Sequence, residues 1–252
     1  MQRESDLRTF IIAFVLAVIC SFLVSGAAVA LKAKQDRNKD LERMKNVLIA
    51  GGLYQTGMDV EKAFESIDIV FADIKTGDSV KGNVKDYFNN FKNLSTGSSS
   101  IKLAKEQDVA GIKSIPPKIP VFMVKKADGS LDKVIIPIYG SGLWSTMYGF
   151  LALEADFDTV CGITFYDQAE TPGLGGEVAN PVWQKTWVGK KVYDDSGNVV
   201  LAIVKGGAQG VHQVDSLSGA SLTSRGVQGI IRFWMGDNGF AKFFNKMKQG
   251  VM

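Results

Sequence analysis

Histidine and cysteine are scarce in this chain of 252 residues, which contains one His, His212, and two Cys, Cys20 and Cys161. Zinc sites with nitrogen and sulfur ligands and protein-bound iron–sulfur clusters need about four such ligands. The sequence therefore predicts no metal site of either kind. A nucleophilic pair of Cys161 and His212 is conceivable, but a lone Cys in an apolar stretch is usually a small buried side chain. We expect no catalytic residue in this chain.

The net charge of the chain is also small. The formal net charge is +3, and the basic residues do not gather beside aromatic residues. Proteins that bind nucleic acid usually carry a basic patch or stripe. The composition therefore predicts no nucleic-acid partner.

A long hydrophobic run lies near the N-terminus. Residues 10–31 are uncharged and mainly apolar, long enough as a helix to cross a hydrocarbon core of roughly 30 Å. A cleaved signal peptide is the alternative, but its apolar region usually has only about 7–15 residues. We therefore expect residues 1–32 to be a retained single-pass transmembrane anchor.

The charges beside this run favour a cytoplasmic location for the domain that follows. Arg3 and Arg8 precede the run, and a larger number of basic residues follow it. Those that follow are Lys32, Lys34, Arg37, Lys39, Arg43 and Lys45. This count has little weight, however, because long domains translocate largely regardless of charge.

The rest of the chain divides into two parts. Residues 33–115 begin with alternating charges and continue with a partial helical stripe at residues 59–71, which indicates a juxtamembrane helical or accessory region. The polar residues 93–100 are typical of a loop. Residues 116–252 carry strand signals and form the second domain.

Strand and turn signals dominate the second domain. Residues 120–124 and 133–138 flank Asp128-Gly129, which is a strong hairpin signal. Residues 160–166 predict another strand. The pattern as a whole predicts an α+β fold with a mainly antiparallel sheet and flanking helices, preceded by one N-terminal transmembrane helix.

The end of the chain continues this pattern. Residues 191–193 and 199–204 predict a second hairpin around Asp195-Ser196-Gly197-Asn198. Residues 240–247 predict a last short helix.

The segment 215–224, Asp-Ser-Leu-Ser-Gly-Ala-Ser-Leu-Thr-Ser, places hydroxyl groups and small residues before a helical pattern. The apolar residues that follow have the spacing of one helix face and are Val227, Ile230, Ile231 and Trp234. Thr223 is therefore expected at or near a helix N-terminus, where unpaired N–H groups stabilise an anion such as a phosphate. The alternative is that Ser221 or Thr223 merely caps the helix.

The same string resembles the flavinylation motif of the FMN-binding domain family, in which the last Thr, here Thr223, bears FMN through a phosphoester bond. The family usually has Ser-Gly-Ala-Thr-x-Thr, and this chain keeps the hydroxyl with Ser221. The resemblance implies covalent FMN, installed by a flavin transferase that uses FAD and a divalent metal. The other motif residues that it implies are Asp215, Ser218, Gly219, Ala220, Ser221 and Leu222.

Two Gly-rich segments support the resemblance. Residues 140–146 begin like a dinucleotide fingerprint, but the third Gly is absent and no βαβ pattern surrounds them. Residues 170–177 are typical of a turn in which the backbone can approach another group closely. Both segments resemble loops that, in the same family, lie beside the isoalloxazine ring and ribityl chain.

The resemblance gives expected roles to the residues of these loops. Apolar contact to the ring is expected from Leu143, Trp144 and Leu174. Hydrogen bonds to its polar edge are expected from Ser145, Thr146 and Thr171, and Glu170 and Gly175 belong to the second loop. Lys205, at the end of a predicted strand, is either a cation beside the ring or phosphate or an ordinary surface Lys.

The order of the motifs behind one membrane span resembles the flavin subunits of multi-subunit membrane redox pumps. Sodium-translocating NADH:quinone reductases are favoured over Rnf-type ferredoxin:NAD reductases, whose subunit typically has a shorter region before the flavin domain. The resemblance implies an electron relay in the bacterial inner membrane, with a periplasmic domain and no complete activity alone. A non-redox membrane-tethered binding or scaffold protein is the alternative.

Overall fold

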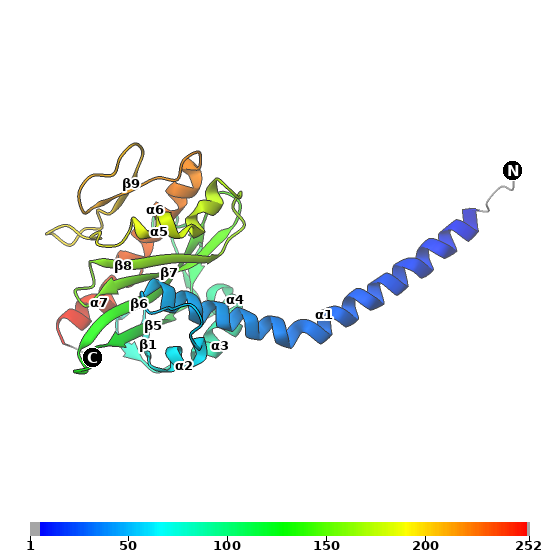
Figure 1. Cartoon of the computed structure of the whole chain (residues 1–252), viewed down its shortest axis with the longest axis horizontal. Coiled ribbons are helices and arrows are strands. Elements are labelled where there is room, and N and C mark those ends of the chain that lie inside the picture. Colours follow the sequence, from blue (N-terminus) through cyan, green and yellow to red (C-terminus); the bar gives the residue numbers. More distant parts are fainter. Residues whose placement is uncertain (1–5, 251–252) are drawn as a thin grey trace. The chain divides into compact units, whose positions relative to one another are not determined.

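The computed structural model describes residues 6–250, so Arg3, which entered the charge count, lies outside the described residues. The chain forms two compact units, Met1–Glu42 and Arg43–Met252. Helix α1 spans Asp6–Ala50 and supplies all the described residues of the first unit. It is long and apolar enough to cross a membrane, which fits a single-pass anchor (Figure 1).

The second unit is built on a six-stranded antiparallel sheet in the order β2-β1-β5-β6-β7-β8. Its strands are β1 Asp68–Asp73, β2 Ser79–Val80, β5 Lys118–Lys125, β6 Leu131–Ser141, β7 Thr146–Glu154 and β8 Val160–Asp167. The pairing of β6 with β7 runs to Ser141 opposite Thr146, so the two strands end together at the turn 142–145.

The other elements are shorter, apart from α6. The helices are α2 Val60–Glu65, α3 Val84–Asn89, α4 Phe91–Thr96, the 3₁₀ helix η1 Gly175–Ala179, α5 Pro181–Lys185, α6 Ser221–Met235 and α7 Ala241–Lys248. Two small sheets pair β3 Ile101–Lys102 with β4 Ser114–Ile115 and, in parallel, β9 Ala202–Val204 with β10 Gln213–Asp215.

Alternate side chains of the central strands enter two separate cores, because successive residues of a strand point to opposite faces. On β6, Val134 and Ile136 belong to the larger core, which α6 and α7 share, whereas Ile135 belongs to the smaller one. The smaller core also contains Val47 and Leu48 from the last turns of α1. The sheet is therefore covered on both faces within the second unit.

Several expected elements are confirmed. The hairpin around Asp128-Gly129 is β5 and β6, and residues 160–166 lie in β8. The helices expected after Thr223 and near residues 240–247 are α6 and α7.

The helix predicted from the stripe at residues 59–71 is only partly confirmed. Helix α2 ends at Glu65, and β1 begins at Asp68. β1 pairs with both β2 and β5, so it satisfies the backbone groups of β5 that a helix would leave unpaired. Within the polar stretch 93–100, α4 continues to Thr96.

The hairpin predicted from residues 191–193 and 199–204 does not form as a continuous pair of strands. Residues Tyr193 and Val199 form a single isolated bridge. β9 pairs instead with β10 in parallel, and the backbone N–H groups of Val192 and Tyr193 donate to the Asp158 carboxylate. A side chain therefore takes hydrogen bonds that the expected partner strand would have taken.

Gly162 provides a test of how tightly the last turn of α1 packs on the sheet. A Cβ at this position would lie 2.4 Å from the carbonyl oxygen of Ala50. We expect Gly162→Ala to lower the free energy of unfolding by roughly 1–3 kcal/mol through overpacking, measured by urea denaturation of the full chain in detergent. The control is Gly26→Ala, where nothing lies within 4 Å of the new Cβ. Equal stability of the two variants would contradict this packing.

Candidate functional site

Three segments that are far apart in the sequence meet at the side chain of Glu170. The first is the turn 142–145 between β6 and β7, and the second is the segment that follows β8. The third is the start of α6, which carries Thr223. The sheet positions the first two, because β7 pairs with β6 on one side and with β8 on the other.

The Glu170 carboxylate accepts hydrogen bonds from both of the other segments. The Thr223 hydroxyl donates to Oε2 at 2.6 Å, and the backbone N–H of Leu143 donates to the same oxygen at 3.2 Å. The N–H groups of Trp144 and Ser145 donate to Oε1 at 2.8 and 3.3 Å. Glu170 is 4% exposed and Thr223 is 1% exposed, so the bond between them is buried, whereas the bonds from the turn are partly buried.

The hydrogen bonds keep this carboxylate ionised. Burial by itself raises the pKa of Glu170, but the bonds from Thr223 and from the N–H groups of Trp144, Leu143 and Ser145 outweigh it and lower the pKa. Among the described residues no cation forms an ion pair with Glu170. Neutral donors alone therefore stabilise the negative charge.

Glycines make room for this cluster. A Cβ at Gly175 would lie 2.5 Å from Thr223 Oγ1 and 2.8 Å from Glu170 Oε2, and a Cβ at Gly142 would lie 2.5 Å from Glu170 Oε1. Gly219 has φ +70°, a conformation that favours glycine, and a Cβ there would lie 2.9 Å from Leu174 Cδ2. The backbone therefore closes directly around the hydroxyl and the carboxylate.

The start of α6 is not capped as the alternative interpretation of the motif supposed. Its N-cap residue is Ala220, and no side chain makes a capping hydrogen bond. The Thr223 hydroxyl donates to Glu170 instead, and the Ser221 side chain is exposed. The interpretation of Ser221 or Thr223 as a simple helix cap is therefore wrong.

The loop before α6 is fixed by its own side chains. Ser224 Oγ accepts a hydrogen bond from the N–H of Leu217 at 3.0 Å. Asp215 Oδ1 accepts from the N–H groups of Gly207 and Ala208 at 3.0 and 2.7 Å. The motif therefore holds the neighbouring loop that begins after β9.

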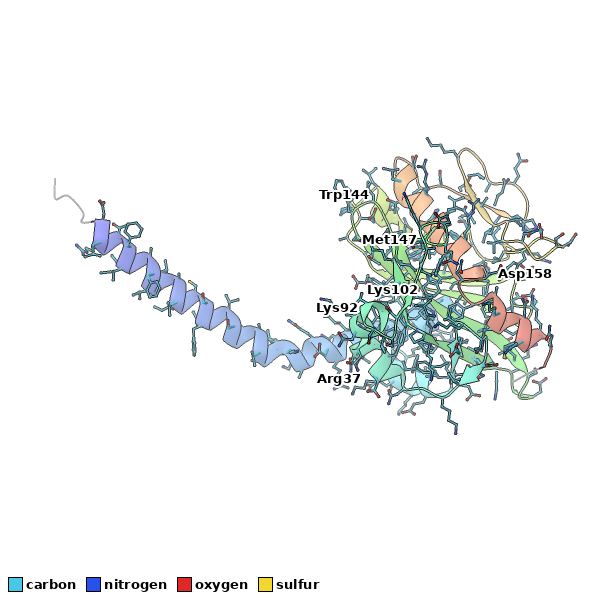
Figure 2. All side chains as sticks on the ribbon, turned by 180° about the vertical axis from the view of Figure 1, so that it is seen from behind. Arg37, Lys92, Lys102, Trp144, Met147 and Asp158 are labelled. Carbon is cyan, nitrogen blue, oxygen red and sulfur yellow. The ribbon has the colours of Figure 1, made fainter. Side chains whose placement is uncertain are left out.

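Large apolar side chains surround the cluster on the outside. Trp144 is 71% exposed and projects from the β6–β7 turn at the edge of the unit (Figure 2). The other exposed apolar side chains of the three segments are Leu143, Leu174 and Leu222. An exposed Trp with three exposed Leu residues is a surface suited to an apolar ligand or partner.

The other expected site residues have more varied surroundings. Ser145 Oγ accepts from the N–H of Ala169 at 2.8 Å, and the Thr171 carbonyl accepts from the N–H groups of Leu174 and Gly176. Thr146 lies opposite Ser141 at the start of β7. Ser218 is exposed.

Lys205 is exposed just beyond β9. Within residues 6–250 no hydrogen bond or ion pair joins it to Thr223 or Glu170. Its role beside the ring or phosphate stays a prediction.

The Cys161–His212 pair has no support in the structure. His212 Nδ1 lies 2.9 Å from the carbonyl oxygen of Lys191, and Cys161 lies in β8. Burial raises the pKa of Cys161 to about 11, so its thiol is a poor nucleophile near neutral pH.

Sequence reasoning missed Ser224 and Gly142. The hydroxyl directly after Thr223 and the Gly directly before Leu143 were the available signals, but each has its partner in another part of the chain. Sequence order alone does not identify such partners.

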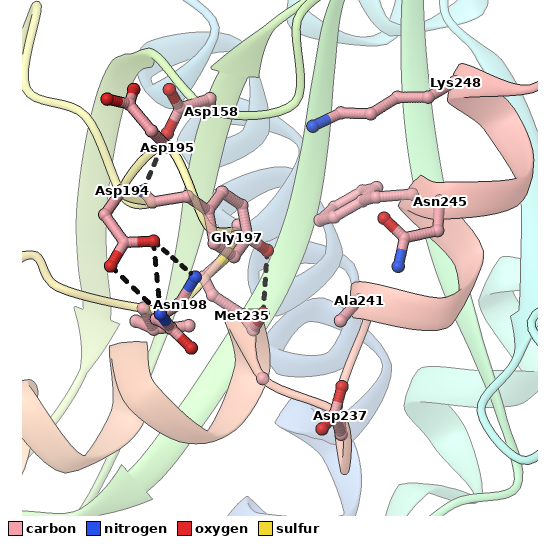
Figure 3. A pocket seen from close by; sticks show the side chains of 14 residues that line it. Asp158, Asp194, Asp195, Gly197, Asn198, Met235, Asp237, Ala241, Asn245 and Lys248 are labelled. Atoms are coloured by element: carbon pink, nitrogen blue, oxygen red, sulfur yellow. Dashed lines mark hydrogen bonds between the residues drawn. The ribbon is translucent and has the colours of Figure 1, made fainter.

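A pocket of about 450 Å³ lies elsewhere, between the 193–199 turn and the C-terminal end of α6 (Figure 3). None of the expected site residues lines it. Two of its four carboxylates are already engaged, since Asp194 accepts from Ser196 and Asn198 and Asp158 accepts from Val192 and Tyr193. The candidate site is therefore the Glu170–Thr223 cluster.

The Glu170–Thr223 cluster lies within a region that matches a known family. The FMN-binding domain model matches residues 142–236. The C subunit of the Na(+)-translocating NADH-quinone reductase of Yersinia pestis is 43% identical and covers 100% of this chain and 96% of its own. Its counterpart in Neisseria meningitidis is 43% identical, covering 98% of this chain and 96% of its own.

Two solved structures are similar as well. The crystal structure of Shewanella oneidensis NqrC has a TM-score of 0.78 and 36% identity, covering 84% of this chain and 99% of its own. The corresponding protein of the Na(+)-translocating NADH-quinone reductase from Parabacteroides distasonis has a TM-score of 0.65 and 25% identity, covering 85% of this chain and 96% of its own.

The lowered pKa of Glu170 makes the stability of the unmodified chain depend on pH. The folded pKa lies below the unfolded one, so this contribution is present above the unfolded pKa and is lost as the pH falls through the folded pKa. At neutral pH we expect Glu170→Gln to lower the free energy of unfolding by on the order of 1.5–3 kcal/mol, the range for hydrogen bonds to a charged group. On acidification the free energy of unfolding of this variant should fall less than that of the wild type. Urea denaturation at several pH values measures both effects, and parallel pH profiles would contradict the assignment.

Proposed function

Since the chain belongs to the family of C subunits of the Na(+)-translocating NADH-quinone reductase, we propose that it carries FMN covalently on Thr223. It is a redox subunit of that oxidoreductase complex, and the other subunits of the complex are its partners. Its FMN-binding domain is the matched region 142–236, which contains the Glu170–Thr223 cluster.

The observation that carries the proposal is the position of the Thr223 hydroxyl at an uncapped helix start. The first N–H groups of a helix and its dipole stabilise an anion, so they fit the phosphate of FMN. Gly175 leaves no Cβ over this point. The donor set therefore fits a phosphate attached to Thr223, for which the backbone closed around the hydroxyl has to open.

The surrounding side chains fit the remainder of FMN. Leu143, Trp144 and Leu174 are exposed apolar groups on two of the segments that meet at Glu170, so they would cover the ring and exclude water from it. Ser145, Thr146 and Thr171 would hydrogen-bond its polar edge. Bound FMN supplies the electron-transfer chemistry, which the side chains of this domain do not provide.

The tether has a physical advantage. A covalent bond holds the flavin at a very high effective concentration beside its pocket, so it is not lost between reduction and oxidation. The chain then acts as an electron relay between other redox centres of the complex. It needs no dinucleotide-binding site of its own for that role.

Attachment requires a flavin transferase that uses FAD and a divalent metal. Ser218, Gly219, Ser221 and Leu222 are exposed, so they are accessible to such an enzyme, and Ala220 is the N-cap of α6. Asp215 is exposed but also holds the 207–208 backbone. We assign the motif to recognition by the transferase and to fixing the loop that bears Thr223.

The domain lies on the periplasmic side of the inner membrane in this proposal, with α1 as its anchor. The basic residues after the apolar run argue for the opposite orientation, but their weight is small ahead of a long translocated domain. Maturation by a transferase outside the cytoplasm would also explain why the flavin is retained by a covalent bond.

Thr223→Val removes the hydroxyl with little change in side-chain size. We expect the wild-type chain, expressed with the transferase, to gain the mass of one FMN minus water, and Thr223→Val to gain nothing. In the assembled complex the variant should lose NADH-driven quinone reduction while NADH oxidation by an artificial acceptor remains. Thr186→Val makes the same change outside the site, where the hydroxyl bonds only its own helix, and should keep both the flavin and the activity. Quinone reduction by a flavin-free Thr223→Val complex would refute the relay.

Membrane orientation is tested by protease treatment. We expect a protease added to intact spheroplasts to degrade the domain that follows α1, because that domain faces the periplasm. A cytoplasmic protein should stay intact as the control for membrane integrity. Degradation only after lysis would place the domain in the cytoplasm.

A further inference from the structure

We propose that Glu170 is the proton acceptor for the Thr223 hydroxyl during flavin attachment, an inference that rests on the covalent FMN proposed above. The hydroxyl already donates its hydrogen to Glu170 Oε2 at 2.6 Å. Attachment at Oγ1 requires the loss of this same hydrogen. The carboxylate therefore stands where a general base for the attachment has to stand.

Other groups that could accept the proton are engaged elsewhere. Glu177 Oε2 accepts from Asn180 Nδ2 at 2.6 Å, and His212 Nδ1 lies 2.9 Å from the Lys191 carbonyl. Among the described residues, Glu170 is the only side chain to which the Thr223 hydroxyl donates.

The carboxylate is held by a second segment, separate from the backbone that covers Thr223. This cover is the backbone around Gly175, where an added Cβ would lie 2.5 Å from Thr223 Oγ1. The cover has to open before a transferase can reach Thr223, which is 1% exposed. Glu170 also accepts from the N–H groups of Leu143, Trp144 and Ser145, which belong to the β6–β7 turn and not to the cover. These three bonds can hold the acceptor in place while the backbone at Gly175 moves.

The step balances with FAD as the flavin donor and a divalent metal on its pyrophosphate. Thr223 Oγ1 forms a bond to the flavin-side phosphorus as the bond from that phosphorus to the bridging oxygen breaks. AMP leaves with the bridging oxygen and its electron pair, and the proton of Oγ1 passes to Glu170 and then to water. Phosphoryl transfer has a loose transition state, and protein kinases use an Asp carboxylate to accept the substrate hydroxyl proton.

Glu170 is in the ionised form that a proton acceptor requires. Burial raises the pKa of Glu170, but the hydrogen bonds from the hydroxyl and the three N–H groups lower it by more. The acceptor is therefore ionised near neutral pH. The charged residues on the surrounding segments are Asp167 at the end of β8, Glu177 on η1 and Arg225 on α6. Within residues 6–250 none of them hydrogen-bonds to Glu170.

The test measures the initial rate of flavin attachment to the full chain in detergent, with FAD, Mg²⁺ and a catalytic amount of transferase, by intact mass. We expect Glu170→Gln to slow the rate roughly 10²- to 10⁴-fold, the usual range for a general base. Glu177→Gln is the matched control in the same loop and should react at the wild-type rate. Circular dichroism and thermal unfolding define the folded fraction of each variant.

A rescue experiment separates proton transfer from a structural role. Glu170→Ala removes atoms equivalent to one acetate ion, so added acetate can occupy the space. Fluoroacetate has nearly the same size but is a weaker base. We expect acetate to restore more of the attachment rate than fluoroacetate at equal concentration and ionic strength.

Each outcome decides the proposal. Equal rescue by the two acids, no rescue of a folded Glu170→Ala chain, or a wild-type rate for folded Glu170→Gln would overturn it and place the base on the transferase. If Glu170→Ala does not fold, the rate of Glu170→Gln per folded molecule decides alone. Failure of the wild-type chain to gain flavin on Thr223 would instead reject the proposed function.

Discussion

A buried carboxylate without a cation has to be surrounded by hydrogen-bond donors, and this requirement organises the site. Glu170 receives donors from the β6–β7 turn and from α6, so these segments cannot separate without leaving a charge unpaired in the interior. Leaving such a group without donors costs more than an ordinary surface contact contributes. The carboxylate therefore acts as the common attachment point of the three segments.

The sheet makes this arrangement possible because it places strand ends side by side. β6 ends at Ser141 where β7 begins at Thr146, and β8 ends at Asp167 beside the start of β7. The turn 142–145 and the segment after Asp167 therefore lie at the same end of these strands. α6 packs on β6 and brings its first turn to the same edge. The long central strands thus set the spacing of the site, and the short loops supply its chemistry.

Local patterns predicted the elements whose signals are local. The Asp128-Gly129 hairpin and the apolar face of α6 were visible because their repeats lie within one element. Residues 67–71 could be read as helix or strand, since a short apolar run has no decisive period, and only pairing with β2 and β5 decided it. The motifs marked the segments that meet at Glu170, but the Glu170–Thr223 bond joins residues on separate elements, and no local spacing encodes it.

The burial of Thr223 bears on the order of folding and maturation. A hydroxyl that is 1% exposed is unavailable in the closed fold, so the proposed attachment would proceed in proportion to the fraction of molecules whose cover is open. A newly made chain would therefore be modified either before the cover closes or, more slowly, through local opening. An esterified Oγ1 would have no hydrogen to return to Glu170, so the original closed arrangement could not form again. Closure of the backbone over Thr223 would thus set how quickly new copies of the chain gain their flavin.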